Sequence, residues 1–252
     1  MKTNLILTVI FIFSFWGCDK NKTPENQSSK IVCVLFDLSE TTNTPEIRKT
    51  YLDKFRIVLN RMHPGDVIEA ALITEKSLSE LELSIECEFP VIKTKTNTEL
   101  FEKKFKEQSD SILNIKIDSL LIVADSVLFK PKRKILRTEI LSSLQVAERV
   151  FKSFKQPRKV LVIFSDMIEE SSIANFARRD VSGSLADEII KKQKENGTLP
   201  DLKGVKVYVV GAAHSDTKKY NQIRNFWLNY FEHNGAVMEK QNYGAALIRF
   251  DE

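Results

Sequence analysis

Beyond about residue 29, apolar residues along the chain follow two alternating patterns. Short, continuous apolar runs are typical of strands buried on both faces of a sheet, and they predict strands at residues 30–36, 66–74, 81–89, 159–164 and 205–210. The tail at residues 236–250 is expected to supply a last edge strand. Between these runs, apolar residues recur three or four positions apart, which is the spacing of amphipathic helices.

This helical spacing predicts the elements that connect the strands. The first helix carries Ile47, Tyr51, Phe55, Val58 and Met62 on one side, and Pro45 suits its first turn. The other helices are predicted at residues 99–128, with a break near Asn114, from Thr138 to about residue 154, at 185–194, and around 223–231.

The alternation of strands and helices predicts one α/β domain at residues 30–252. We expect a doubly wound, mostly parallel six-stranded sheet with helices on both faces. The link between the second and third predicted strands is too short for a crossover, so the third strand should run antiparallel at one edge.

The N-terminal segment has a pattern of its own. Lys2, an apolar stretch from about Leu5 and the pair Gly17-Cys18 resemble a bacterial lipoprotein signal peptide with its lipobox. This resemblance implies a signal peptide at residues 1–17, lipid on Cys18, a polar flexible tether at 18–29, and a place in the cell envelope, on the periplasmic side or the cell surface. The alternatives are an uncleaved anchor, or a cleaved signal in which Cys18 is incidental.

The net charge and the positions of the cysteines argue against nucleic-acid binding and against a structural zinc site. The formal net charge is +4, and basic and acidic residues are interspersed, so nucleic-acid binding is not indicated. Cys33 and Cys87 lie in strand-like runs, where they either pair in an oxidising compartment or remain buried thiols. No C-x-x-C spacing is present, which argues against a structural zinc site.

Oxygen-bearing side chains gather where predicted strands end. Asp37, Ser39 and Thr41 follow the first strand, Ser165 and Asp166 follow the fourth, and Thr138 opens a helix between them. Ligand sites of open α/β sheets lie at these carboxyl ends. Carboxylates and hydroxyls without imidazole or thiolate suit a hard divalent cation such as Mg²⁺ or Mn²⁺.

Each of these residues also has a purely structural interpretation. Asp37 could cap the loop after its strand by accepting hydrogen bonds from backbone amides. Thr138 could be an ordinary helix N-cap, and Asp166 could be a polar residue at a strand end. Their shared position at one edge of the predicted sheet favours a joint site.

In this order, the residues resemble the von Willebrand factor type A domain and its metal-ion-dependent adhesion site. Asp37, Ser39 and Thr41 match that family's Asp-x-Ser-x-Ser element, with threonine last, while Thr138 and Asp166 match its later threonine and aspartate. The resemblance implies a metal site made by these five residues. The family often has glycine where Glu40 and Met167 stand here.

The resemblance implies a non-enzymatic module that binds a protein partner through the metal, with an acidic side chain of the partner completing the site. The basic residues Lys130, Lys132, Arg133, Lys134 and Arg137 would favour such a partner, or simply form a solvated loop. The alternatives are a metal-free structural scaffold of an envelope complex and, less favoured, a hydrolase. A hydrolase lacks support because no Gly-x-Ser-x-Gly turn is present and His214 has no evident nucleophile partner.

Overall fold

The structure is a computed structural model that describes residues 29–74, 83–91, 99–130, 135, 137–247 and 250. Over these residues the strands are β1 (Lys30–Asp37), β2 (Val67–Ile73), β3 (Leu83–Glu88), β4 (Arg158–Phe164), β5 (Val205–Val210) and β6 (Tyr243–Gly244). The α-helices are α1 (Pro45–Leu59), α2 (Glu99–Phe129), α3 (Ile140–Ser153), α4 (Gly183–Glu195) and α5 (Thr217–His233), and a short 3₁₀ helix, η2, spans Lys240–Asn242.

The described strands form a six-stranded sheet in the order β3-β2-β1-β4-β5-β6. β1 lies at the centre and pairs in parallel with both β2 and β4, whereas β3 runs antiparallel to β2 at one edge. This topology confirms the predicted fold class, a doubly wound sheet of the kind implied by the resemblance to von Willebrand factor type A domains. The last strand is much shorter than the predicted tail strand, since β6 pairs with β5 over two residues.

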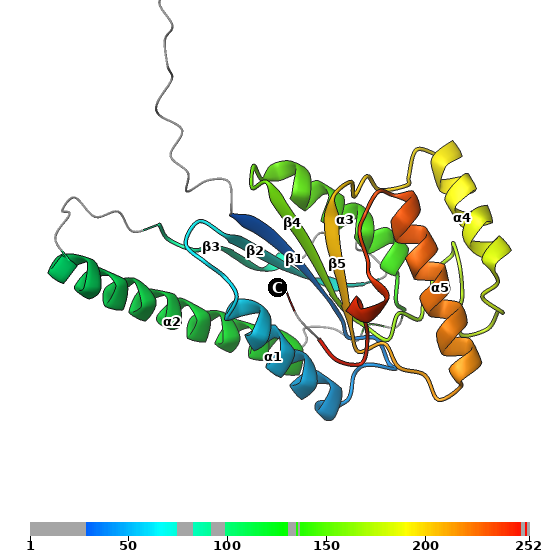
Figure 1. Cartoon of the computed structure of the whole chain (residues 1–252). Coiled ribbons are helices and arrows are strands. Elements are labelled where there is room, and N and C mark those ends of the chain that lie inside the picture. The colour runs from blue at the N-terminus through cyan, green and yellow to red at the C-terminus, as the bar shows by residue number, and fades with distance from the viewer. Residues whose placement is uncertain are drawn as a thin grey trace, which may run out of the picture.

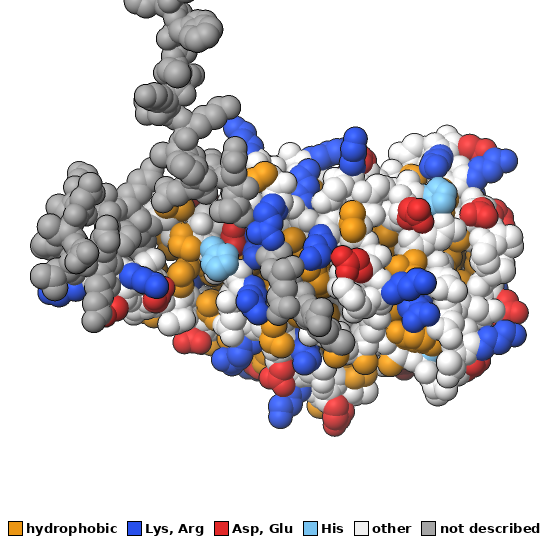
Figure 2. All heavy atoms as spheres, in the orientation of Figure 1, with side chains coloured by type: hydrophobic (Ala, Val, Ile, Leu, Met, Phe, Trp, Pro, Cys, Tyr) orange, Lys and Arg blue, Asp and Glu red, His pale blue; other side chains and the backbone are white. Residues whose placement is uncertain are grey.

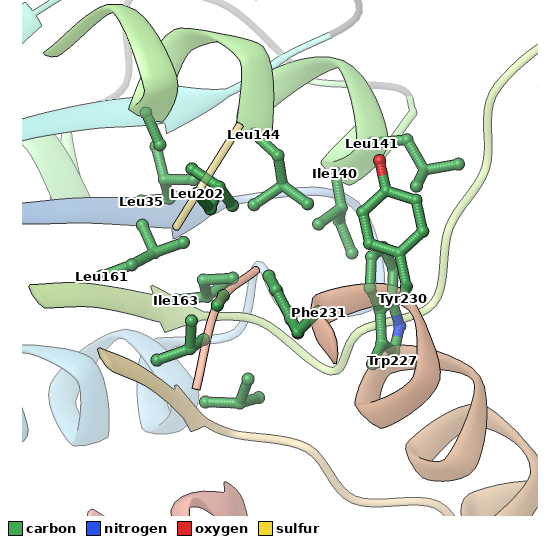
Figure 3. Packing of buried hydrophobic residues seen from close by; sticks show 14 of the residues in the cluster. Leu35, Ile140, Leu141, Leu144, Leu161, Ile163, Leu202, Trp227, Tyr230 and Phe231 are labelled. Atoms are coloured by element: carbon green, nitrogen blue, oxygen red, sulfur yellow. The ribbon is translucent and has the colours of Figure 1, made fainter. Parts of the chain in front are cut away.

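Helices cover both faces of the sheet (Figure 1), and each face has its own apolar layer. α1 and α2 pack on one face, against side chains such as Val34 and Phe36 of β1. α3, α4 and α5 pack on the other face, in the apolar layer to which Leu35, Leu161 and Phe231 belong (Figure 3). Because successive residues of β1 alternate between the two layers, the whole strand is buried, which is why its sequence is a continuous apolar run.

The two cysteines of the domain lie in different layers. Cys33 belongs to the layer under α3, α4 and α5, and Cys87 belongs to the layer under α1 and α2. Both are buried free thiols, so the alternative in which they pair is wrong and the buried-thiol alternative is confirmed.

α2 continues without interruption from Glu99 to Phe129, so the predicted break near Asn114 is wrong. The helix contains neither proline nor glycine, and an exposed asparagine costs only a few tenths of a kcal/mol relative to a better helix former. At the positions of α2 whose burial is described, residues 104 and 106–116 are exposed or half-buried, and Ile117 is the first buried residue.

Among the described residues, no helix is both long enough and apolar enough to cross a membrane. The predicted signal peptide and Cys18 lie outside the described residues, as does all of the predicted tether except Ser29. Basic and acidic side chains are interspersed over the coloured part of the face shown in Figure 2.

Candidate metal centre

The predicted site residues lie around the carboxyl ends of β1 and β4, which are neighbours in the sheet. Phe36 pairs with Phe164, so Asp37 and Ser165 emerge side by side although 128 residues separate them in the chain. At this point the chain order reverses, since β1 leads to β2 on one side and β4 leads to β5 on the other. Such switch points form the ligand crevices of open α/β sheets.

The segment 37–42, here the β1 loop, folds back on the Asp37 carboxylate. One carboxylate oxygen of Asp37, Oδ1, accepts a hydrogen bond from the Ser39 backbone amide at 2.9 Å. The Thr42 hydroxyl donates to the Asp37 carbonyl at 2.8 Å and closes the turn. The Ser39 and Thr41 hydroxyl oxygens lie 3.3 Å apart, so the two predicted hydroxyl ligands are neighbours.

The segment 165–170, here the β4 loop, supplies the second half of the site. The Ser165 hydroxyl donates to the other Asp37 carboxylate oxygen, Oδ2, at 2.7 Å. The same hydroxyl accepts a hydrogen bond from the Met167 amide at 2.9 Å. Asp166 accepts a hydrogen bond from the Ile168 amide at 2.9 Å. Ser165 therefore joins the two loops, a role that its place beside Asp166 in the sequence did not reveal.

Met167 adopts a left-handed backbone conformation, with φ of 65°. This conformation is strained for a residue with a side chain and favours glycine, which is the residue that the domains resembled by this sequence often have here. Two features stabilise this conformation. The Met167 side chain is fully buried, and the Met167 carbonyl accepts a hydrogen bond from the Trp227 indole at 2.9 Å. Methionine therefore stands where that family pattern has glycine, but the backbone keeps a conformation that glycine favours.

Thr138 lies beside the β4 loop, where its carbonyl accepts a hydrogen bond from the Glu170 amide at 2.8 Å. Its side chain is buried but does not cap a helix, because α3 begins at Ile140 and Glu139 occupies the N-cap position. The prediction that Thr138 opens the helix is therefore wrong by two residues. Instead, the backbone amide of Leu141, in the first turn of α3, donates to the buried carboxyl of Glu169 at 3.0 Å.

Asp166 lies close enough to Asp37 for its charge to act on that carboxyl. Burial first, and then the charge of Asp166, raise the pKa of Asp37 to about 6, against hydrogen bonds from Ser39 and Ser165 that lower it. Burial also raises the pKa of Asp166, whereas hydrogen bonds from the Ile168 amide and the Thr41 hydroxyl lower it. A single patch therefore contains oxygen atoms of five side chains, namely Ser165, Asp37, Ser39, Thr41 and Asp166.

This donor set fits a hard divalent cation. The charged form of the buried Asp37 carboxylate, which the charge of Asp166 disfavours, would be stabilised by a positive ion between the two side chains. The remaining donors are hydroxyls, and among the described residues no group of three or more His, Cys, Asp and Glu side chains forms a metal cluster. Such an oxygen set suits Mg²⁺ or Mn²⁺ better than zinc. Glu40, like its neighbour Thr41, is exposed.

Other predicted features lie around the patch. His214 is close enough for its charge to lower the pKa of Asp166, and its Nδ1 accepts a hydrogen bond from the Asp216 amide at 3.0 Å. In the basic cluster, Lys130 and Arg137 are exposed, while Lys132, Arg133 and Lys134 lie outside the described residues. No local sequence pattern indicates that Glu169 or the hydroxyl of Tyr51 lies near the site. The helical spacing of Tyr51 predicts only a core residue.

No protein-family model matches this chain, and no curated protein matches it. Among solved structures, it is similar to proximal thread matrix protein 1 of the mussel byssus, with 13% identity and a TM-score of 0.44 over 85% of this chain and 44% of that one. It is also similar to an aerotolerance-related membrane protein from Bacteroides fragilis, with 10% identity and a TM-score of 0.43 over 83% of this chain and 90% of that one.

A third similar structure is the manganese-loaded TRAP protein of Plasmodium vivax, with 14% identity and a TM-score of 0.43 over 79% of this chain and 63% of that one. The chain therefore spans less than two thirds of the mussel and Plasmodium chains. At such identities and TM-scores, the fold class of this chain is assigned from its own strand order. Any ligand has to be inferred from its own side chains.

Proposed function

We propose that this protein is a non-enzymatic binding module that captures a carboxylate of a protein partner through a Mg²⁺ or Mn²⁺ ion. The observation that carries the proposal is the meeting of Asp37 and Asp166, which follow strands far apart in the sequence, in one patch lined with hydroxyls, where Asp37 is buried and Asp166 is half-buried. Without a cation, the charge of Asp166 raises the free energy of the charged form of Asp37, and this arrangement is costly for a purely structural role.

In this proposal, Asp37 and Asp166 supply the negative charge of the site, directly or through water. Ser39, Thr41 and Thr138 supply neutral oxygen ligands, which bind a cation without cancelling its charge. The bound ion would supply the positive charge that attracts a partner's carboxylate. Asp37 is held for this role before any ion binds, because both of its carboxylate oxygens accept hydrogen bonds from the surrounding loops.

We further propose that lipid on Cys18 anchors the domain in the cell envelope, as the N-terminal resemblance implies. The partner would then be a protein of the same compartment that presents an acidic side chain. The exposed residues Lys130 and Arg137, which flank the chain leading to Thr138, would favour such a partner electrostatically.

Calorimetric titration of chelator-treated protein with Mg²⁺ and with Mn²⁺ tests the metal site. The wild type should bind one ion, and Asp37→Ala should abolish binding while the far-ultraviolet circular dichroism stays unchanged. Asp216→Ala is the matched control, because this aspartate caps α5 and is exposed. It should lower stability by about 1 kcal/mol and leave ion binding intact. A wild type that binds neither ion would overturn the proposal.

Addition of acetate, a model carboxylate, tests the open position on the ion. If a partner's carboxylate completes the coordination, acetate should strengthen Mg²⁺ binding by the wild type and have no effect on Asp37→Ala. Unchanged Mg²⁺ affinity in acetate would contradict carboxylate capture even if the ion itself binds.

One observation favours the metal-free scaffold as a second candidate. α2 exposes several large apolar side chains to solvent, with Ile115 67% and Ile122 72% exposed. An apolar helix face of this kind is suited to contact with another protein. The same titration separates the two candidates, since a scaffold that works through α2 does not require the ion.

A further inference from the structure

Tyr51 reaches the candidate metal centre from α1, on the side of the sheet opposite to α3. Its ring packs against Phe164 of β4 at 5.3 Å between centroids, and its side chain is 1% exposed. The hydroxyl end passes over Gly211, directly after β5. A Cβ atom at Gly211 would lie 3.1 Å from the Tyr51 hydroxyl oxygen and 3.3 Å from the Ser165 carbonyl oxygen.

Gly211 provides the space for this approach. Its φ of +101° is accessible mainly to glycine, and a Cβ there would also lie 3.0 Å from the Tyr51 ring. The chain thus combines a glycine after β5 with a tyrosine in α1, and together they bring a phenol to the carboxyl ends of β4 and β5.

The Tyr51 hydroxyl is buried and has no hydrogen-bond partner among the described residues. The charges of Asp37 and Asp166 act on it, because after burial they are the causes that raise its pKa above the ordinary value. Tyr230, in the opposite layer, shows the usual arrangement, since its buried hydroxyl donates to the Gln193 side chain at 2.7 Å. A buried hydroxyl without a partner is costly to the fold, and this one lies by Gly211 and Ser165, within reach of the charges of Asp37 and Asp166.

We propose that Tyr51 is a positioning residue of the metal centre, where its hydroxyl oxygen accepts a hydrogen bond from a water molecule bound to the ion. This inference rests on the proposed function. Mg²⁺ usually keeps several waters in protein sites, and the ion makes those waters strong hydrogen-bond donors. Groups that orient such ligands from the outer shell commonly change metal affinity by about 10- to 100-fold when removed. The phenol would thereby gain the partner that it lacks in the ion-free fold.

The test compares Tyr51→Phe with Tyr230→Phe, two variants that each remove one buried hydroxyl from opposite layers. Calorimetry should show Mg²⁺ bound about tenfold more weakly by Tyr51→Phe and unchanged by Tyr230→Phe. Thermal melting without metal should give the opposite ranking. Tyr230→Phe should melt below the wild type because it loses a made hydrogen bond, whereas Tyr51→Phe should melt at or above it because it loses an unpaired hydroxyl.

Near-ultraviolet difference absorption provides a second readout that does not depend on affinity. Saturating Mg²⁺ should perturb the tyrosine spectrum of the wild type and of Tyr230→Phe, and the perturbation should be absent from Tyr51→Phe. Equal Mg²⁺ affinity of Tyr51→Phe and the wild type, or an equal spectral change, would overturn the role of Tyr51 and leave the metal site standing. If the wild type binds no Mg²⁺, the proposed function fails, and this inference fails with it.

Discussion

The β1 loop and the β4 loop meet at the same patch but are held in different ways. The β1 loop is fixed by bonds within itself, since Thr42 and the Ser39 amide both bind Asp37. The β4 loop also has bonds within itself, at Ser165 and Asp166, but distant elements hold it as well, with α5 binding the Met167 carbonyl and α3 binding the Glu169 carboxyl. A short motif can therefore specify the first loop, whereas the second depends on the completed fold.

The largest expected effect concerns Glu169, the buried carboxyl of the β4 loop. Burial raises the pKa of Glu169 to about 8, outweighing the hydrogen bonds that the carboxyl accepts. An unfolded chain releases this proton near the ordinary value of 4.5. Between these two values the folded state binds the extra proton, so this group's contribution to stability falls as pH rises.

Glu169→Gln removes the titration and leaves an amide oxygen for the Leu141 amide. From about pH 5 to pH 8 the wild type should lose roughly 4 kcal/mol of unfolding free energy relative to the variant, as measured by urea denaturation at each pH. A difference between the two proteins that stays constant with pH would show that the β4 loop does not hold a buried neutral carboxyl.

The next effect concerns the left-handed residue of the same loop. Met167→Ala and Met167→Gly both remove the buried side chain, but only glycine relieves the strain at φ 65°. Glycine should therefore be the more stable of the two by about 1 kcal/mol, measured by urea denaturation. At Val150, buried within α3, the order should be reversed, with alanine more stable than glycine by about 1 kcal/mol. Alanine ahead of glycine at position 167 would contradict a strained β4 loop.

The last effect, which is no larger than the one at Met167, concerns the β1 loop. Thr42→Val keeps the shape of the side chain but removes the hydroxyl that donates to the Asp37 carbonyl, so it should cost about 1 kcal/mol of unfolding free energy. Thr50→Val is the control, because its hydroxyl donates to the Glu46 carbonyl on the exposed surface of α1. It should change stability by less than about 0.5 kcal/mol. Equal losses in the two variants would show that the β1 loop gains nothing from its internal bonds.

The same contrast explains what the sequence could predict. Continuous apolar runs located the strands, because a strand buried on both faces needs apolar residues at nearly every position. The spacing of Asp37, Ser39 and Thr41 predicted a clustered set of oxygens, because their contacts lie within one turn. These predictions depend only on neighbours along the chain.

The remaining parts of the site depend on contacts that no local pattern encodes. Glu169 follows β4 in a polar stretch, and only the position of α3 shows that its carboxyl is buried. Met167 gives no sign of a left-handed backbone, since methionine rarely adopts one. The helical spacing of α1 is equally consistent with Tyr51 as an ordinary core residue. Its hydroxyl comes close to the site only because Gly211, directly after β5, leaves room for it.

The hydrogen bond between Asp37 and Ser165 has a consequence for how the chain folds. It joins residues 128 positions apart, so the loop that it closes contains more than half of the protein. Contacts of such long range form late and slow folding, because the entropy of closing the loop must be lost first. During synthesis, β1 emerges early and remains without its β4 neighbour until that strand has also been made. The contact between Asp37 and Ser165 is therefore expected to form only in the last stage of folding.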